Sequence, residues 1–326
     1  MTMSERGAGS ADVAGRLPDF FVIGHEKCGT TALYRILRSH PEVFMPELKE
    51  PRFFSREPGP PPPGAAAGAL PRTLEAYLEL FAPARAEQLA GEASPQYIRS
   101  ANAAARIAEL QPRARAIALL REPVSFLRSF HLACVRSGQE DQRDLRKALE
   151  LEPQRRRGER IPSGCRAPAR LLYSEHVRYV EQLRRFEDAL SRERVHVIVY
   201  DDLRRANERV ARDALRFLGL DERLPIDVSR GGGSARKSVR NLTVHRLAIA
   251  LKRARRRPDS APAALRALDA LTPAWLEAAA RRALYAPPPP LDRRLAADLR
   301  ARFEPDVAAL GDHIGRDLLR EWGYRG

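Results

Sequence analysis

Short apolar runs alternate with amphipathic stretches along most of the chain. Three runs have the length and content of buried β-strands, and they cover residues 19–24, 115–120 and 195–200. Apolar residues also recur at helical spacing in further segments. These segments are 30–39, 102–110, 123–135, 170–190, 203–218, 239–255 and 291–310. The alternation predicts the α/β class, with a central parallel sheet flanked by helices on both faces.

Segments rich in proline, glycine or small polar residues separate these elements. Residues 1–16 are small and polar, and we expect a disordered tail followed by a single domain over residues 17–326. Four further segments are predicted to be irregular, namely 58–71 as a loop or flexible lid, 155–170 as a basic surface loop, 231–233 as a Gly-rich loop and 287–290 as a rigid proline spacer.

Composition narrows the class of protein. A chain of 326 residues with 44% hydrophobic and 30% charged residues is typical of a soluble globular protein with a sizeable core. No apolar run reaches the ~18 residues of a transmembrane helix, and no signal peptide is visible, so we expect a cytoplasmic protein. Cys28, Cys134 and Cys165 have neither the number nor the spacing of a disulfide framework or a zinc site.

The charge balance points to anionic partners without identifying them. The chain has 57 Lys+Arg and 42 Asp+Glu, which gives a formal net charge of +15. A nucleic-acid-binding protein is one interpretation, but the sequence has no recognition-helix signature and no aromatic–basic platform. Only five of the cations are lysines, at positions 27, 49, 147, 237 and 252. This scarcity draws attention to each lysine.

The first predicted strand leads into the segment GHEKCGTT, from Gly24 to Thr31. Glycine allows backbone angles and close approaches that other residues resist, and the next helix begins with unpaired N–H groups and a positive dipole end. Together these features predict an anion cradle, most often for phosphate. The spacing is similar to the P-loop G-x4-G-K-[ST], but Thr30 stands at the lysine position and Lys27 lies inside the loop. A P-loop-type small-molecule kinase and an ordinary strand–helix turn stay open as alternatives.

The second predicted strand is followed by a similar arrangement. Arg121 comes directly after the strand, and Ser129 lies about two helical turns further on. Open α/β sheets bind ligands at the carboxyl ends of their strands, and a guanidinium with a hydroxyl suits a phosphate monoester. The alternative is a salt bridge from Arg121 to Glu122 or Glu150. Two anion sites at neighbouring strand ends indicate a ligand with two anionic groups.

Six stretches resemble the sulfotransferases that use 3′-phosphoadenosine 5′-phosphosulfate (PAPS), in particular the glycan and heparan-sulfate branch in its bacterial form. They are PDFFVIGHEKCGTTALYRILRSHPEV, KEPRFFS, GEASPQY, LLREPVSFLRSFH, VHVIVYDDL and GRDLLREW, in the expected order from about Pro18 to Trp322. The resemblance implies the P-loop-like sulfotransferase fold. It also implies transfer of a sulfuryl group from PAPS to a hydroxyl of a carbohydrate, glycolipid or secondary-metabolite acceptor, with no metal required.

The resemblance also implies roles for individual residues. Lys27 would stabilise the leaving phosphate, and Glu50 would act as the general base on the acceptor hydroxyl. The donor-binding residues implied are Lys27, Cys28, Gly29, Thr30 and Thr31 for the 5′ end, Arg121 and Ser129 for the 3′-phosphate, and Arg236 and Lys237 in a loop over the nucleotide.

Some residues depart from the glycan branch. Arg52 stands where the KEPHFF segment has His, Ala93 stands where some glycan enzymes have Lys, and Cys28 replaces a usual Gly. These departures affect the prediction of the acceptor more than the prediction of the donor. Lys49 and Arg52 are expected to lower the pKa of Glu50, which leaves His25 and His131 as alternative bases.

Overall fold

The computed structural model describes residues 15–56, 70–231, 238–239, 285–288 and 290–325. The chain forms two compact units. The first unit comprises Met1–His25, Gly29–Leu119 and Gln182–Gly232, and the second comprises Glu26–Cys28, Leu120–Glu181 and Gly233–Gly326. Within the described ranges, no helix combines the length and the apolar character needed to span a membrane.

A five-stranded parallel sheet forms the centre of the first unit, in the order β2-β3-β1-β4-β5. Its strands are β1 (Phe20–Gly24), β2 (Val43–Phe44), β3 (Leu89–Glu92), β4 (Arg115–Leu120, whose last residue belongs to the second unit) and β5 (Val195–Val199). The sequence predicts β1, β4 and β5, and the structure confirms all three. It does not predict β2 and β3, because a two-residue strand and the four residues LAGE carry too little apolar pattern to be recognised.

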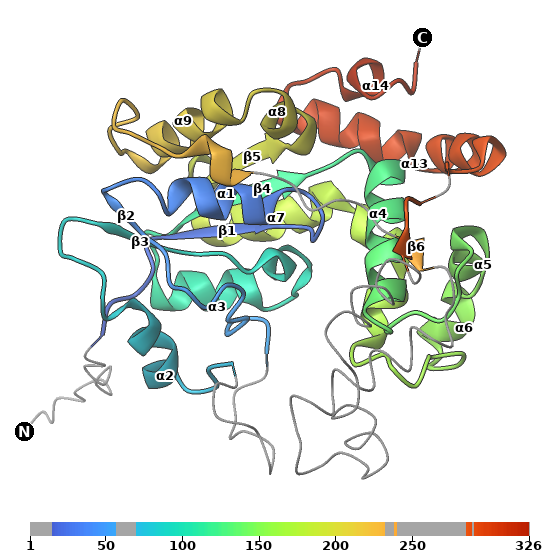
Figure 1. Cartoon of the computed structure of the whole chain (residues 1–326), viewed down its shortest axis with the longest axis horizontal. Coiled ribbons are helices and arrows are strands. Elements are labelled where there is room, and N and C mark those ends of the chain that lie inside the picture. Colours follow the sequence, from blue (N-terminus) through green and yellow to red (C-terminus); the bar gives the residue numbers. More distant parts are fainter. Residues whose placement is uncertain (1–14, 57–69, 232–237, 240–284, 289, 326) are drawn as a thin grey trace, which may run out of the picture. The chain divides into compact units, whose positions relative to one another are not determined.

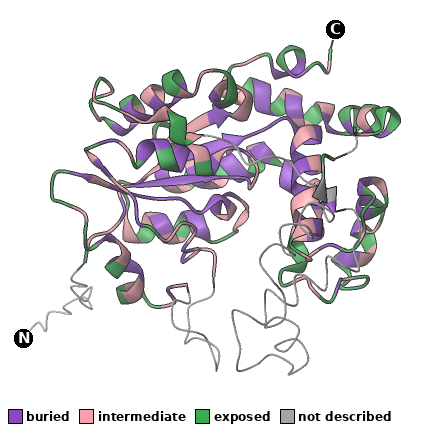
Figure 2. Ribbon diagram, in the orientation of Figure 1, coloured by how far each residue is buried: buried purple, intermediate pink, exposed green. Residues whose placement is uncertain are grey.

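Helices cover both faces of this sheet, as expected. In Figure 1, α1 (Thr30–Leu37) and α9 (Asn207–Leu218) lie on one face and α3 (Ala103–Leu110) lies on the other. Every residue of β1 is buried, as Figure 2 shows. A strand covered on both faces reads as a continuous apolar run, which is why FFVIG was recognisable in the sequence. The unit also contains α2 (Leu74–Leu78), α8 (Tyr200–Arg205), most of α7 (Tyr179–Leu190), and the 3₁₀ turns η1 (Glu79–Phe81), η2 (Pro95–Arg99), η5 (Arg192–Arg194) and η6 (Val228–Gly231).

The second unit is built around α4 (Pro123–Arg136), which packs against α13 (Arg293–Ile314). Glu122 caps α4, because its carboxylate accepts hydrogen bonds from the backbone N–H groups of Val124 and Ser125 at 2.9 and 2.7 Å. The predicted helices at 123–135 and 291–310 are therefore confirmed. The described part of this unit also contains α5 (Leu145–Glu150), α6 (Glu152–Arg156), η3 (Pro168–Leu171), η4 (Tyr173–Val177), α14 (Leu318–Glu321) and the antiparallel pair β6 (Ser238–Val239) and β7 (Tyr285–Ala286).

Three helix boundaries differ from the predictions. The helix expected from residue 170 begins at Tyr179, because the preceding residues form the turns η3 and η4 and Glu152 accepts bonds from the N–H and hydroxyl of Ser174. The helix expected over 203–218 is interrupted at Ala206, whose φ of −144° is not helical. The helix expected from residue 239 is wrong at Val239, which lies in β6, and its remainder lies outside the described residues.

The segment predicted as a basic surface loop, 155–170, begins in the interior. Arg155 lies in α6, and its side chain and that of Glu140 are both fully buried. Two hydrogen bonds of 2.7 and 2.8 Å join them, and Tyr173 donates a third bond to Glu140 at 2.8 Å. The prediction was wrong for Arg155, because the sequence does not show the distant carboxylate that pairs with it. Most of the proposed lid at 58–71 lies outside the described residues.

Candidate active site

The turn after β1 requires glycine at both of its ends. Gly24 has a φ of +126°, and a Cβ there would lie 2.3 Å from the carbonyl oxygen of Leu119 in the neighbouring strand. Gly29 has a φ of +93°, and its Cβ would lie 2.8 Å from Leu203. Gly29 is also the N-cap of α1, and no side chain caps this helix or places a carboxylate in its first turn. The amino end of α1 therefore keeps its preference for an external anion. Thr30 is buried and Thr31 is exposed there.

Lys27 lies between these glycines in a backbone conformation that is rare for a residue with a side chain. Its φ is +72°, and its carbonyl oxygen accepts a hydrogen bond from Nη1 of Arg121 at 3.1 Å. Its ammonium group makes no hydrogen bond or ion pair within the described ranges. Burial lowers the pKa of Lys27 most, Arg136 and Arg121 lower it further, and Glu26 raises it in part. A half-buried cation that has no bonded partner among the described residues is suited to a bound anion.

The second unit thus brings two sequence-predicted residues, Lys27 and Arg121, into direct contact. Arg121 is 4% exposed, and its own carbonyl oxygen accepts a bond from the buried hydroxyl of Tyr179 at 2.8 Å. Ser129 is buried within α4, two turns after Arg121, and Cys28 is also buried. Arg236 and Lys237 lie outside the described residues.

Glu50 lies in the first unit between two cations. Lys49 Nζ lies 2.7 Å from its Oε1, and Arg52 Nη2 lies 2.6 Å from its Oε2. Burial alone would raise the pKa of Glu50, but these contacts outweigh burial and hold that pKa below its usual value. Glu50 is therefore a carboxylate at neutral pH, and its side chain is 24% exposed. It can accept a proton, although the two cations weaken it as a base.

Two motifs of the sequence meet around Glu50. The backbone N–H of Glu50 donates to the carbonyl oxygen of Ala93 at 3.1 Å, and the N–H of Arg52 donates to Oγ of Ser94 at 3.0 Å. These bonds join KEPRFFS to GEASPQY. They also support left-handed backbone conformations at Glu50 and Arg52, whose φ values are +62° and +60°. The conformation of Glu50 is thus fixed by tertiary contacts.

The sequence did not single out Glu92, which lies at the end of β3 and is fully buried. Its Oε2 accepts hydrogen bonds from the hydroxyl groups of Tyr77 and Tyr97 at 2.6 and 3.0 Å. Its Oε1 has no partner in the described part of the chain. Burial raises the pKa of Glu92 to about 7, although the nearby hydroxyl groups of Ser94, Tyr77 and Tyr97 lower it. A carboxyl in GEASPQY was visible in the sequence, but its burial was not.

The two histidines considered as alternative bases are both buried. His25 Nε2 lies 2.7 Å from Oε1 of Gln182, and His131 Nε2 lies 2.8 Å from the carbonyl oxygen of Gln142. Burial lowers the pKa of His131. Each ring therefore has a hydrogen-bonding role inside its own unit.

Comparison with known proteins shows a related family and a related fold. The family model described as the sulfotransferase domain matches residues 17–230. The crystal structure of a sulfotransferase from Alicyclobacillus acidocaldarius superposes with a TM-score of 0.65 at 27% sequence identity, covering 93% of this chain and 97% of that one.

Two curated relatives match shorter segments. Carbohydrate sulfotransferase 15 of Homo sapiens is 54% identical over 41 residues, which are 13% of this chain and 7% of that protein. Heparan sulfate glucosamine 3-O-sulfotransferase 3B1 of Mus musculus is 32% identical over 119 residues, which are 36% of this chain and 26% of that protein. The chain thus spans a minor part of the length of either relative. Because the family model covers well over half of the sequence, this chain belongs to the sulfotransferase domain family.

Proposed function

We propose that this protein transfers a sulfuryl group from PAPS to a hydroxyl of a carbohydrate, glycolipid or secondary-metabolite acceptor. The contact between Arg121 and Lys27 carries the proposal, because it joins the two anion-binding segments that the sequence predicts separately. PAPS has anionic groups at both its 5′ and 3′ ends, which suits two such segments.

Residues of the two anion-binding segments would bind the two phosphate ends of the donor. Gly29, Thr30 and Thr31 would offer backbone N–H groups and the dipole of α1 to the 5′-phosphate. Arg121 and Ser129 would bind the 3′-phosphate, where a guanidinium fork is well matched to phosphate oxygens. A bonding role for Cys28 would involve its backbone N–H, since its side chain is buried.

The reaction would then proceed by displacement at sulfur. The acceptor oxygen forms a bond to sulfur while the bond from sulfur to the bridging phosphate oxygen breaks. The Lys27 ammonium would stabilise the charge that develops on that leaving oxygen. The Glu50 carboxylate would take the proton of the acceptor hydroxyl, and adenosine 3′,5′-bisphosphate would leave.

The proposed acceptor class follows the relatives, which carry carbohydrate and heparan sulfate glucosamine in their names. A glycan hydroxyl is therefore the first class to test. Arg52 adds a cation beside Glu50, which would favour an acceptor with an anionic group nearby.

Turnover of PAPS with a panel of glycan, glycolipid and small-molecule acceptors tests the proposal, with product detection by mass spectrometry. We expect a sulfated product and adenosine 3′,5′-bisphosphate. Lys27→Ala should lower kcat by about 100-fold or more, since electrostatic stabilisation of this kind is worth ~3–4 kcal/mol. Arg35→Ala, on the exposed face of α1, is the matched control and should retain activity.

The same assay separates the kinase alternative. A P-loop-type kinase would consume ATP with magnesium and leave PAPS unchanged. Failure of the wild-type protein to bind adenosine 3′,5′-bisphosphate in calorimetry would rule out the proposed donor.

A further inference from the structure

An ion pair holds the residue that precedes Lys27. Arg170 donates to both carboxylate oxygens of Glu26, at 2.5 and 2.7 Å, although the two residues are 144 positions apart. Their side chains are only 13% and 23% exposed. A shielded bidentate pair of this kind is directional and stronger than a solvent-exposed pair. None of the sequence motifs includes this contact.

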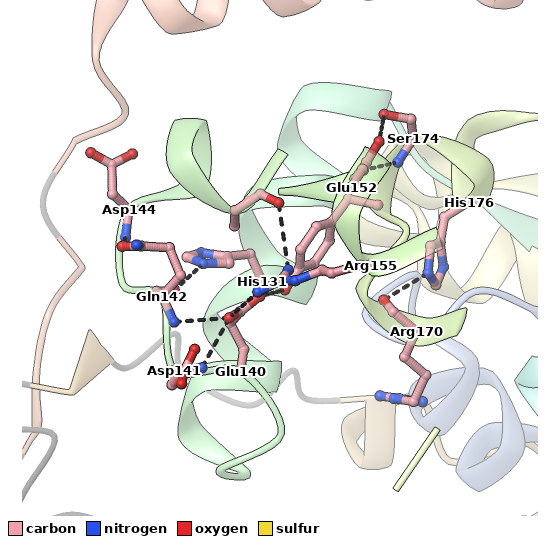
Figure 3. A network of polar contacts seen from close by, with 12 residues as sticks. His131, Glu140, Asp141, Gln142, Asp144, Glu152, Arg155, Arg170, Ser174 and His176 are labelled. Atoms are coloured by element: carbon pink, nitrogen blue, oxygen red, sulfur yellow. Dashed lines mark hydrogen bonds and ion pairs between the residues drawn. The ribbon is translucent and has the colours of Figure 1, made fainter. Parts of the chain in front are cut away.

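Arg170 is itself fixed by its neighbours in the second unit. Its guanidinium lies 5.1 Å from the ring centroid of Phe130 in α4, a cation–π contact. The rings of Phe130 and His176 pack with their centroids 4.5 Å apart. Nε2 of His176 lies 3.1 Å from the carbonyl oxygen of Arg170, a contact drawn in Figure 3. The partner of Glu26 is therefore anchored through its side chain and its backbone.

The loop is thus held at two consecutive residues. Arg170 binds the side chain of Glu26, and Arg121 binds the carbonyl oxygen of Lys27. A left-handed backbone is strained at a residue such as Lys27 and persists only where surrounding contacts enforce it. These two contacts provide that enforcement.

We propose that Glu26 and Arg170 are positioning residues for sulfuryl transfer, whose ion pair fixes the loop so that the Lys27 ammonium is held at the leaving oxygen. This inference rests on the proposed function and extends it to residues that do not touch the substrate.

The Glu26–Arg170 ion pair also affects the pKa of Lys27 through electrostatics. The charged or titratable groups around Lys27 are Glu26 and Cys28 in its own loop, Arg121 just before α4, and Arg136 at the end of α4. Glu26 raises the pKa of Lys27, while both arginines lower it. Arg170 binds both oxygens of Glu26 and offsets the charge of that carboxylate, which limits its effect on Lys27. Arg170 also faces Cys134, whose pKa burial raises to about 12, so this thiol stays neutral.

Two substitutions that remove the opposite charges of the Glu26–Arg170 pair test the proposal. Glu26→Gln and Arg170→Gln should each lower kcat roughly 10- to 100-fold, with the KM for PAPS changed by less than about 2-fold. Because Lys27 must be protonated, activity is lost as pH rises through its pKa. Glu26→Gln removes the carboxylate that raises the pKa of Lys27. The decrease of kcat at alkaline pH, called the alkaline limb below, should therefore move to lower pH. Arg170→Gln removes the cation that offsets this carboxylate, so the limb should move to higher pH.

A conservative variant and a surface pair complete the design. Arg170→Lys keeps the charge but loses the bidentate fork, so kcat should fall less than in Arg170→Gln and the alkaline limb should stay. Arg157→Gln is the control, because its pair with Glu159 is 60% and 55% exposed, and wild-type kcat is expected.

The outcomes separate this inference from the proposed function. Turnover by the wild-type protein together with unchanged kcat and pH limb in Glu26→Gln and Arg170→Gln would overturn the positioning role alone. Limbs that move in the same direction, or a loss of kcat explained by a lower melting temperature, would show a merely structural pair. Absence of any PAPS-dependent turnover in the wild-type protein would overturn both proposals.

Discussion

At the scale of single residues, the environment of each carboxyl decides its chemistry. Glu50 is paired with two cations and keeps a low pKa, whereas Glu92 is buried among hydroxyl groups and has a pKa of about 7. The two residues belong to motifs that contact one another through the carbonyl oxygen of Ala93 and the hydroxyl of Ser94. One is thus a carboxylate available for proton transfer, and the other is a buried group that titrates near neutral pH.

If Glu50 is the base, its ion pairs determine the pH at which kcat/KM falls on the acid side, here called the acid limb. Glu50 must be unprotonated to accept a proton, so kcat/KM falls as pH drops through its pKa, which lies below 4.5. Arg52→Gln removes one of the two cations that lower the pKa of Glu50, so the limb should move to higher pH. Arg38→Gln is the control, because it removes an exposed pair with Glu47. An unchanged limb in Arg52→Gln would contradict Glu50 as the base.

The buried carboxyl of Glu92 predicts a loss of stability as pH rises. Its pKa is about 7 in the folded protein and near 4.5 when unfolded, so the folded state binds more protons between these values. The free energy of unfolding should therefore fall by up to about 3 kcal/mol from pH 4.5 to pH 8. Glu92→Gln stays neutral and should lack this contribution.

Denaturant titrations of the two proteins at several pH values measure the difference. Glu47→Gln, at a carboxyl that is 91% exposed, should match the wild-type protein throughout. Equal pH dependence in Glu92→Gln and the wild-type protein would show that Glu92 is already ionised when folded.

At the scale of secondary structure, capping determines how α4 presents its residues. Glu122 accepts from two backbone N–H groups of the first turn and also from the hydroxyl of Tyr324 at 2.8 Å. Arg121 precedes this cap and Ser129 lies two turns after it. The cap therefore ties the chain near its C-terminus to the helix that would bind the 3′-phosphate.

Loss of the Glu122 cap should lower the free energy of unfolding more than loss of an exposed helix cap. Glu122→Ala is expected to lower the free energy of unfolding by about 2 kcal/mol, because it removes the cap and leaves Tyr324 without its acceptor. Asp144→Ala is the matched comparison, since Asp144 caps α5 through two similar bonds but is exposed, and about 1 kcal/mol is expected. Equal losses by chemical denaturation would show that the bond from Tyr324 adds nothing.

At the scale of the whole molecule, the net charge of +15 does not define one partner. Many arginines already pair with carboxylates, for example along α9, where Arg209, Arg212 and Arg216 contact Asp213 or Glu208. The cations that matter for the proposed donor are few. Specific binding should therefore depend on the two anionic ends of the nucleotide more than on total charge.

Ligand-induced stabilisation tests this view. Adenosine 3′,5′-bisphosphate at 100 times its Kd should raise the free energy of unfolding by about 2.7 kcal/mol. Adenosine 5′-monophosphate at the same concentration should give a much smaller increase, because it lacks the 3′-phosphate, and Arg121→Ala should reduce the difference between the two ligands. Thermal unfolding measures all of these. Equal stabilisation by both nucleotides would argue against a 3′-phosphate site at Arg121.

The sequence by itself determined the local parts of this protein. The fully apolar FFVIG and RAIALL predicted β1 and β4, and the positions of Gly24 and Gly29 predicted the tight turn between β1 and α1. These features can be read locally, because strand burial and turn geometry depend on the residue types within a few positions. The order of motifs was enough to indicate the family.

Only the tertiary structure decided which polar residues are buried and which charges meet. Arg155 was predicted on the surface and is buried with Glu140, and Glu26 pairs with an arginine 144 positions away. The pKa of Glu92 is raised by the complete loss of solvent and lowered in part by hydroxyl groups such as those of Tyr77 and Tyr97. Solvation and Coulomb interactions depend on distance in space, and a single sequence does not contain that distance.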